Sequence, residues 1–556
     1  MTAFPRKDEK PVSRVEVILS VAIFLFLGIY GVQYHEMWRD EIHGWLVARD
    51  MPSIYELVSY LAYEGHQSLW HLLVRPLTRL FPGPEAMQYL HVIIASATIL
   101  LIFRYSPFSR TQKILLSFGY FFFYEYLFIA RDYAIAVFLI FLVATLFPQR
   151  SKHPAVFATI IFFLFQTNVH ALVVGLGITF TLIADAILKH RRLNLRTSAG
   201  KSLVGAVLII TTGLLTAMWQ LYPPGNILMI NGLERELYLS FDLDRLIELG
   251  RRVMSVFFPV CAFEEGIHCW GRFLIKAYPA VGLIALSSLA VIFGRFLVSH
   301  PASLFLVLSV TVGLLIISYT VYLGNARHHG FLFIALIFAL WIRESCVRVN
   351  HWPIERWLPK VPKSLVSLAL TTLLGIHVLG AIRPIYMDYF FPFSGGKQTA
   401  EFIKKNHLEN LTVIAQQGHP GVSVAGYIGK KEFFYSDHAP SGQFSSFHRF
   451  DVPPRVIDQS IVVSDAISLL VESSPVLVIL NQHLDRDSLD STVSSLVNFE
   501  HIFQSSKNIT EEEFYVYLAT LNNRDQAKEA FALDFSRSGN GPKQSYRKRN
   551  GLQSDP

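Results

Sequence analysis

Long apolar runs, separated by short polar segments that are mostly basic, fill the chain up to about residue 381. An α-helix needs about 20 apolar residues to cross the hydrocarbon core of a bilayer. Runs near that length lie at 15–32, 86–103, 114–129, 133–147, 155–170, 171–188, 202–220, 273–293, 302–322, 330–342 and 364–381. Asn168 and His170 interrupt the stretch from 155 to 188, so the border between those two runs is an interpretation. The pattern predicts a polytopic α-helical membrane protein with about eleven transmembrane helices.

The charges between the runs indicate an orientation. Four basic residues from Arg6 to Arg14 precede the first run, and no small-x-small cleavage site follows it, so we interpret it as a retained anchor. Basic clusters recur at alternate connections, around 104–113, 150–152, 189–201 and 343–363, although the opposite connections also carry arginines. Basic connections favour the cytoplasm. We expect an integral protein of a bacterial inner membrane, with a cytoplasmic N-terminus and an external or periplasmic C-terminal domain.

Composition and charge limit the function classes. Of 556 residues 52% are hydrophobic and 16% charged, whereas soluble proteins carry about a quarter charged residues. The net charge of +7 is attributed to orientation signals and contacts with anionic membrane lipids, not to nucleic acid. Cys261 and Cys269 fall in one predicted external connection, where either a disulfide or two thiols fits. No Walker loop and no Gly-x-Gly-x-x-Gly is present, so nothing indicates ATP-driven transport or a nicotinamide cofactor.

The character of the chain changes after Arg383. We divide it into a transmembrane domain at 1–390, an external α/β domain at 391–521 and a disordered polar tail at 522–556. Helical stretches at 397–405, 422–428, 466–471 and 488–497 alternate with strand-like stretches at 411–415, 432–435, 476–480 and 514–517. No glycine-rich phosphate loop follows these strands, so the domain is interpreted as a lid or an acceptor-docking module. In the membrane part, the sequence pattern of residues 242–256 predicts an amphipathic helix that lies along the membrane interface.

Candidate chemistry gathers at the connections assigned to the outer face. The first of them, 34–85, carries Asp40, Glu41, Glu64, His66 and His71 among aromatic residues that suit the head-group region. Ionisable groups at membrane depth are costly and mark a site by default. Further outer turns carry Arg131 and Asp132, Asn168 and His170, and Arg327, His328 and His329. If the helices bundle, these residues converge, and they offer carboxylates for proton abstraction and guanidinium groups for a phosphate.

Several short motifs, in order, resemble those of a known family. They are Trp-Arg-Asp-Glu (38–41), Tyr-Glu-Gly-His-Gln-Ser-Leu-Trp-His (63–71), Ala-Arg-Asp-Tyr-Ala (130–134), His170 and Arg-His-His-Gly-Phe-Leu-Phe (327–333). Together they are similar to the polytopic glycosyltransferases of the GT-C fold, in the branch of the protein O-mannosyltransferases and the lipid A aminoarabinose transferase. The resemblance implies a sugar donor on a polyprenyl phosphate and a lipid, glycan or protein acceptor outside the cytoplasm, with inversion at the anomeric carbon.

The resemblance also implies residue roles. Asp40 corresponds to the first-loop acid, the general base that takes the acceptor's proton, and Glu41 orients it or helps to hold a cation. Arg131 is the main candidate for the donor phosphate, with Arg327 and His328 as further candidates. Glu64, His66 and Asp132 complete the expected substrate-binding set, although His66-Gln67-Ser68 stands where many relatives have His-Pro-Pro. No residue is assigned as a metal ligand and no cofactor is assigned; a divalent cation is left open.

Each motif also has a plainer explanation. Asp40 and Glu41 fit a solvated interfacial pair, Arg131 and Asp132 a local ion pair, and Arg327 to His329 a contact with lipid head groups. His66 and His71 fit hydrogen-bonded structural histidines. Two other functions stay open: a transporter or flippase for a lipid-linked substrate, which predicts charged residues within broken helices, and a non-catalytic receptor built around the C-terminal domain.

Overall fold

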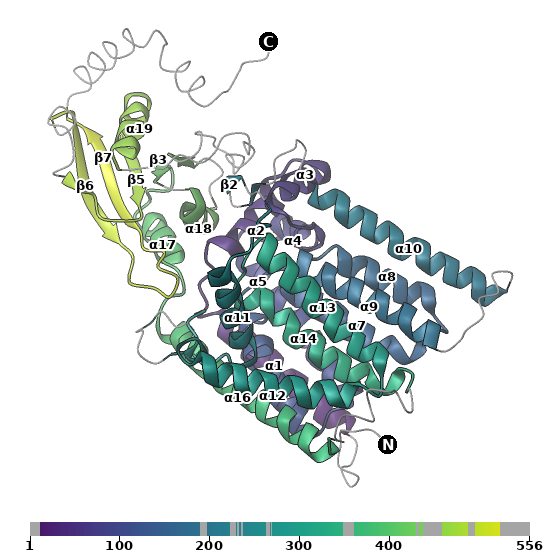
Figure 1. Ribbon diagram of the computed structural model, residues 1–556. Helices are drawn as coiled ribbons and strands as arrows, with labels where there is room; N and C mark the ends of the chain where they lie inside the picture. Colours follow the sequence, from purple (N-terminus) through teal and green to yellow (C-terminus); the bar gives the residue numbers. More distant parts are fainter. Residues whose placement is uncertain are drawn as a thin grey trace.

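The computed structural model describes residues 12–188, 197–222, 229–230, 233–234, 237–262, 267, 270–348, 361–416, 418–429, 433–436, 459–486 and 495–522. A bundle of long helices makes up most of the molecule, and a smaller α/β unit packs against one end of it (Figure 1). The first basic segment and the polar tail, predicted at 1–11 and 523–556, lie outside the described residues.

Within the described residues, eight helices are long and apolar enough to cross a membrane. They are α1 (Arg14–Val32), α5 (Glu85–Tyr105), α9 (Val169–Leu188), α10 (Ser198–Leu221), α12 (Pro279–Leu297), α13 (Pro301–Thr320), α14 (Ala326–Ile342) and α16 (Lys363–Phe390). Many carry large apolar side chains on their outer faces, such as Ile18 and Phe26 of α1, which are 67% and 66% exposed. Such surfaces are stable against lipid and not against water. The protein is therefore a polytopic α-helical membrane protein.

Three of the predicted spans have a different form from a single long helix. Two coincide with the shorter apolar helices α7 (Tyr133–Leu146) and α8 (Pro154–Phe165). The third, 114–129, is not one helix: α6 (Arg110–Ser117) ends before Gly119, and a π-helical turn, η1 (Tyr120–Glu125), follows. A Cβ on Gly119 would lie 3.0 Å from the Cβ of His377 in α16, so the break lets the chain pass close to its neighbour.

The broken segment nevertheless runs from one end of the bundle to the other. At its start Arg110 pairs with Glu16 in the first turn of α1, Nη1 to Oε1 at 3.0 Å. Just beyond its end, the N–H of Ala130 donates to Oε1 of Glu41 at 2.6 Å. Glu41 lies in α2, which follows the C-terminal end of α1. The expectation of a single transmembrane helix here is wrong, but the chain does cross the bundle at this point, and it delivers residues 130–132 to the end where α2 lies.

The predicted outer loop 34–85 is helical over most of its length. It contains α2 (Arg39–Asp50), α3 (Ile54–Glu64) and α4 (Leu69–Leu80). Ser53 and Glu56 cap α3 reciprocally, and α3 ends at Gly65 with φ +69°, a conformation that favours glycine. The apolar faces of these three helices share a core with the α/β unit. The loop is therefore a packed platform between the bundle and that unit.

The connection after α10 holds the predicted amphipathic helix and one of the two cysteines of interest. Helix α11 (Leu243–Phe257) begins where predicted, with Asp242 accepting a hydrogen bond from the N–H of Arg245 at 3.1 Å. A short antiparallel pair, β1 (Met229–Ile230) and β2 (Leu233–Glu234), precedes it. Cys261 is buried, while Cys269 lies outside the described residues, so their pairing stays a prediction. Short turns η2 (Phe147–Gln149), η3 (Leu274–Ala277) and η4 (Arg343–Ser345) complete the bundle.

The α/β unit contains one mixed sheet. Its elements are α17 (Gly396–Lys405), β3 (Thr412–Ala415), α18 (Gly418–Ile428), β4 (Phe434–Tyr435), α19 (Gln459–Glu472), β5 (Val476–Leu480), β6 (Val497–Gln504) and β7 (Tyr515–Leu521). The strand order is β4-β3-β5-β7-β6. Strands β4, β3 and β5 are parallel to one another, and β7 is antiparallel to both of its neighbours, β5 and β6. Strand β6 was not predicted; only two of its eight residues are buried and half of them are polar. The helix predicted at 488–497 falls mainly outside the described residues.

Helix α18 of the α/β unit packs directly on α2 (Figure 1). Gly426 lies so close to Ile42 that a Cβ there would collide with the Ile42 side chain. The hydroxyl of Tyr427 accepts a hydrogen bond from the N–H of Met37 at 2.8 Å. The residues just before Asp40 are thus in contact with the α/β unit.

Candidate active site

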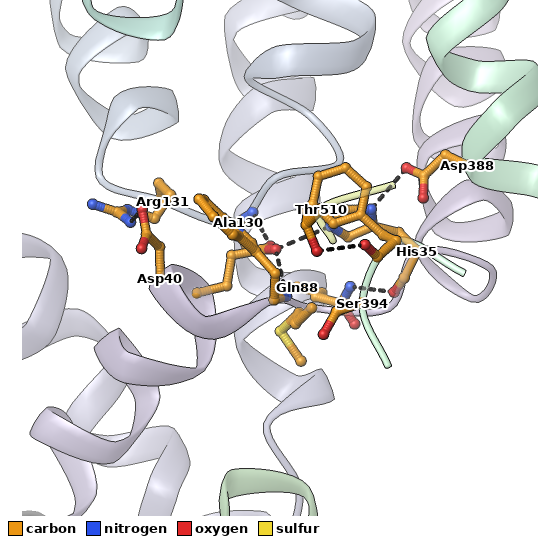
Figure 2. Close-up of polar contacts among 12 residues, drawn as sticks. His35, Asp40, Gln88, Ala130, Arg131, Asp388, Ser394 and Thr510 are labelled. Atoms are coloured by element: carbon orange, nitrogen blue, oxygen red, sulfur yellow. Dashed lines mark hydrogen bonds and ion pairs between the residues drawn. The ribbon is translucent and has the colours of Figure 1, made fainter. Parts of the chain in front are cut away.

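Asp40 lies in the first turn of α2 and faces two arginines from separate parts of the chain. Its Oδ2 is 2.8 Å from Nη1 of Arg131 and 2.9 Å from Nη2 of Arg327. Figure 2 shows the carboxylate of Asp40 turned toward Arg131. Arg131 precedes α7, and Arg327 lies in the first turn of α14. The structure therefore brings together three residues that the sequence places on different connections, while their roles stay predictions.

The shared oxygen of Asp40 has an anion-binding environment around it. The side chains of both arginines are more than four-fifths buried, and that of Asp40 is 18% exposed. Burial by itself lowers the pKa of Arg131, but the charge of Asp40 raises it above its usual value. Two arginines directed at one point match the geometry of a phosphate, which accepts forked hydrogen bonds. The arrangement of these two cations is therefore suited to binding an anion.

Arg327 is enclosed by aromatic rings and keeps unused donors. Its Cζ lies 5.3 Å from the ring centroid of Trp38 and 5.4 Å from that of Trp270, which is within the range of cation–π attraction. Its Nε and Nη1 have no hydrogen-bond partner. Buried donors without partners cost free energy, and a bound anion would remove that cost. Sequence reasoning missed Trp270, which lies far from every motif in the chain.

Asp132 does not pair with its neighbour Arg131, because Arg131 turns to Asp40. Asp132 is 4% exposed and its Oδ1 has no hydrogen-bond partner. Burial raises the pKa of Asp132, and the nearby charges of Arg131 and His66 oppose that rise. The alternative of a purely local Arg131–Asp132 ion pair is wrong. Asp132 presents an unsatisfied carboxylate oxygen close to the two arginines.

Glu41 faces the protein interior and not the arginines that hold Asp40. It is fully buried, and its Oε1 accepts the Ala130 N–H at 2.6 Å. Its Oε2 lies 3.0 Å from Nε2 of His35 and also accepts the N–H of Trp38 at 3.3 Å. Both oxygens are therefore occupied by protein donors. This geometry suits the orienting role among those expected for Glu41, and it leaves no oxygen for a cation.

Glu64 and His66 form part of a histidine cluster beside the site. Nε2 of His43 lies 2.5 Å from Oε1 of Glu64, and Nδ1–H of His66 donates to the Glu64 carbonyl at 3.0 Å. Burial by itself raises the pKa of Glu64, but His43, with smaller contributions from His66 and His71, lowers it to about 2. Burial lowers the pKa of His71 to about 3, so this ring is neutral. Sequence reasoning left His43 unassigned, although it is the principal partner of Glu64.

Of the three consecutive residues at the start of α14, Arg327 alone reaches Asp40. Nδ1 of His328 accepts the N–H of Asn325 at 2.8 Å, which caps the helix, and its ring lies 4.8 Å from that of His170. Nε2 of His329 donates to the carbonyl of Leu323 at 2.7 Å. The structure thus places His328 beside the site in a capping and stacking position.

The α/β unit touches the site through Arg39, the residue before Asp40. Its N–H donates to the carboxylate of Glu512 at 3.4 Å, and its Nε lies 3.4 Å from the same group. The hydroxyl of Ser394 donates to Oε2 of Glu512 at 2.7 Å. Burial raises the pKa of Glu512 to about 7. Ser394 is also shown in Figure 2. Sequence reasoning did not find this link, because Glu512 lies more than 470 residues from Arg39.

The residues around Asp40 do not fit a divalent cation. Two guanidinium groups occupy the one oxygen that faces them, and both oxygens of Glu41 are engaged elsewhere. In the part of the chain that the structure describes, no group of three or more His, Cys, Asp or Glu side chains is arranged to hold a metal ion. A position surrounded by arginines favours an anion.

Fold and site together define a polytopic helical membrane protein with a carboxylate and two arginines at one end of its bundle. No protein-family model matches the chain, and no curated protein matches it. Among solved structures it is similar to the crystal structure of ArnT from Cupriavidus metallidurans bound to undecaprenyl phosphate. That similarity has a TM-score of 0.49 at 11% identity and covers 90% of this chain and 97% of ArnT. A likeness of this degree decides neither the fold family nor the activity.

Proposed function

We propose that this protein is a membrane glycosyltransferase. It takes a sugar from a polyprenyl-phosphate donor and transfers it to a lipid, glycan or protein acceptor on the outer face of the membrane. The observation that carries the proposal is the single carboxylate of Asp40 held by Arg131 and Arg327 at 2.8 and 2.9 Å. The ordered motifs shared with the GT-C glycosyltransferases support it.

In the proposed reaction, the phosphate of the donor replaces Asp40 as the partner of Arg131 and Arg327. A donor phosphate binds the guanidinium groups of Arg131 and Arg327. Arg327 has donors without partners that the phosphate can use. Asp40 then loses its pairing and accepts the proton of the acceptor hydroxyl. The acceptor oxygen bonds to the anomeric carbon as the bond from that carbon to the phosphate oxygen breaks, with inversion. The two arginines stabilise the charge that develops on the departing polyprenyl phosphate.

The distribution of charge favours an enzyme over a carrier. Transporters place polar and charged groups in broken helices at the middle of the membrane. Here the Asp, Glu, Lys and Arg residues of the eight candidate spans lie within about two turns of a helix end. Asp185, for example, pairs with Arg150 at the end of the bundle opposite to Asp40. The transporter or flippase is therefore the second candidate function.

The remaining substrate residues take positions around this centre. Glu64, His66, Asp132 and His328 lie beside it and are proposed to shape the donor's sugar and phosphate site. Glu41 is proposed to orient the Asp40 segment. The α/β unit, which packs on α2, is proposed as the lid or acceptor-docking module. We propose further that this unit lies outside a bacterial inner membrane and that the N-terminus lies in the cytoplasm.

The test compares two Asp→Asn variants of the same helix. Asp40→Asn should lower the rate of sugar transfer from a polyprenyl-phosphate donor by about 10²–10⁴-fold, the usual contribution of a general base. Asp50 also pairs with an arginine, Arg49, at 2.6 Å, and Asp50→Asn should transfer normally. Lipid and glycan profiles of cells with and without the gene would supply the donor and acceptor for this assay. Full activity in Asp40→Asn, or movement of the lipid-linked sugar across the membrane without transfer, would contradict the proposal.

A further inference from the structure

A buried ionic network lies behind the site and connects the ends of α1 and α16 with α2. His35, in the link after α1, places Nδ1 2.7 Å from Oδ2 of Asp388 and Nε2 3.0 Å from Oε2 of Glu41. The side chains of His35 and Glu41 are fully buried, and that of Asp388 is 5% exposed. Figure 2 shows His35 turned toward Asp388 at the end of α16. None of these three side chains contacts the arginines that hold Asp40.

The two contacts require a charged ring. Carboxylates only accept hydrogen bonds, so both nitrogens of His35 must donate, and only the imidazolium form has two N–H groups. Burial by itself lowers the pKa of His35, but the charges of Asp388 and Glu41 raise it by more, to about 10. The ring is therefore protonated at neutral pH.

The network ends on the backbone that carries the site residues. Glu41 follows Asp40 in α2, and its other oxygen accepts the Ala130 N–H at 2.6 Å. Ala130 directly precedes Arg131, the partner of Asp40. The carbonyl of His35 also accepts the side-chain amide of Gln88 from α5 at 3.1 Å, and Figure 2 shows these groups together. A displacement of His35 would therefore move the backbones of Asp40 and Arg131 relative to each other.

We propose that His35 is a positioning residue: bridging Asp388 and Glu41, it keeps the Asp40 and Arg131 backbones in the register needed for sugar transfer. This inference rests on the proposed function. His35 does not touch the substrate and acts only through Glu41 and the Ala130 amide. A misplacement of about 1 Å among catalytic groups lowers a rate by about 10²-fold.

The experiment compares His35→Gln with Asp185→Asn in the full-length protein in lipid nanodiscs. Glutamine is neutral, and both of its side-chain N–H groups are on one nitrogen, so it does not reproduce the charged contacts that the two ring nitrogens of His35 make. Asp185 also belongs to a largely buried ion pair, 2.5 Å from Nη2 of Arg150, at the opposite end of the bundle. Two quantities are measured on the monodisperse, folded fraction: kcat of sugar transfer, and amide hydrogen exchange in the peptide 127–133. In His35→Gln we expect kcat to fall about 100-fold and exchange in this peptide to rise about tenfold, with both unchanged in Asp185→Asn.

Two results would overturn the inference. One is wild-type kcat and wild-type exchange in His35→Gln. The other is an equal loss of kcat in both variants, because that would reflect a general weakening of the bundle. If wild-type protein transfers no sugar, the proposed function fails by itself. The exchange measurement still decides the positioning role in that case: faster exchange confined to His35→Gln supports it, and unchanged exchange rejects it.

Discussion

Two carboxylates of the platform formed by α2, α3 and α4, Asp40 and Glu64, have different kinds of partner. Asp40 is held by Arg131 and Arg327, which stay charged at all relevant pH values. Glu64 is held mainly by His43, whose Nε2 lies 2.5 Å from its Oε1. Both residues lie in the connection 34–85, and the partners brought by other elements distinguish them. At the scale of single residues, partners therefore decide chemistry more than residue type does.

The Glu64 pairing predicts a pH dependence of stability. The pKa of Glu64 falls from 4.5 to about 2 on folding, so its contribution is fully present above 4.5 and is lost as pH falls toward 2. Glu64→Gln should cost up to about 3 kcal/mol of unfolding free energy at pH 7 and progressively less below pH 4.5. Thermal unfolding across this pH range measures the effect. Glu56→Gln, in the same helix, should show no such difference because glutamine also completes the capping box of Ser53. Equal pH profiles for the two variants would contradict the prediction.

At the scale of elements, the broken segment between α6 and α7 positions the loop that carries Arg131 through its contact with α14. Its π-helical turn η1 packs against α14, and Tyr126 donates its hydroxyl to the carbonyl of Arg327 at 2.7 Å. Gly330, one turn further along α14, lies against the ring of Phe121 and the hydroxyl of Tyr126, where a Cβ would collide. The close approach of these two elements brings Arg131 and Arg327 to the same carboxylate. π-Helical turns are often found at functional sites for this kind of reason.

This contact predicts that two glycine-to-alanine substitutions have different effects on the stability of the protein. Gly330→Ala should destabilise the protein by about 1–3 kcal/mol, because an added methyl group overfills a packed contact. Gly294→Ala, in α12, meets no atom within 4 Å and should be neutral or stabilising by up to about 1 kcal/mol. Thermal unfolding in one detergent measures both. If Gly330→Ala is as stable as wild type, the packing of η1 against α14 is looser than described.

At the scale of the whole molecule, the bundle and the α/β unit meet on α2. Helix α18 packs there, Tyr427 accepts the Met37 N–H and Glu512 contacts Arg39. Asp40 thus lies at the joint between the two parts, and a movement of the unit would be transmitted to it. An acceptor that docks on the unit would approach the same place.

Two tyrosine variants test whether the contact between α2 and the α/β unit supports sugar transfer. Tyr427→Phe leaves the buried N–H of Met37 without its acceptor, which costs about 1–3 kcal/mol, and should lower transfer about tenfold as α2 loses its support. Tyr517 accepts the N–H of Leu484 at 2.9 Å inside the α/β unit, so Tyr517→Phe loses an equivalent bond away from the joint. Transfer rates of the two variants, normalised to folded protein, separate the cases. Equal rates would show that the joint does not support catalysis.

The sequence by itself determined the parts whose signal is local. Apolar runs of bilayer length predicted the transmembrane helices, and short apolar or aromatic stretches between helical ones predicted the strands β3, β4, β5 and β7. Burial leaves such a local record, as alternation when one face is buried and as a continuous apolar run when both are. Strand β6, with few buried positions, leaves no such record. Charged residues at the ends of spans marked the candidate site, because such groups are costly at membrane depth. Asp40, Arg131 and Arg327 were singled out in this way.

Only the tertiary structure decided which of these residues meet and which are enclosed. It separated Asp40 from its neighbour Glu41, broke the span at 114–129 beside α16, and added Trp270, His35 with Asp388, and Glu512 to the surroundings of the site. Each of these outcomes depends on contacts between residues far apart in the chain. A hydrogen bond or an ion pair forms between partners from different elements, and no periodicity within one element specifies the other partner. The charge state and exposure of a side chain follow from those partners, so they are properties of the fold.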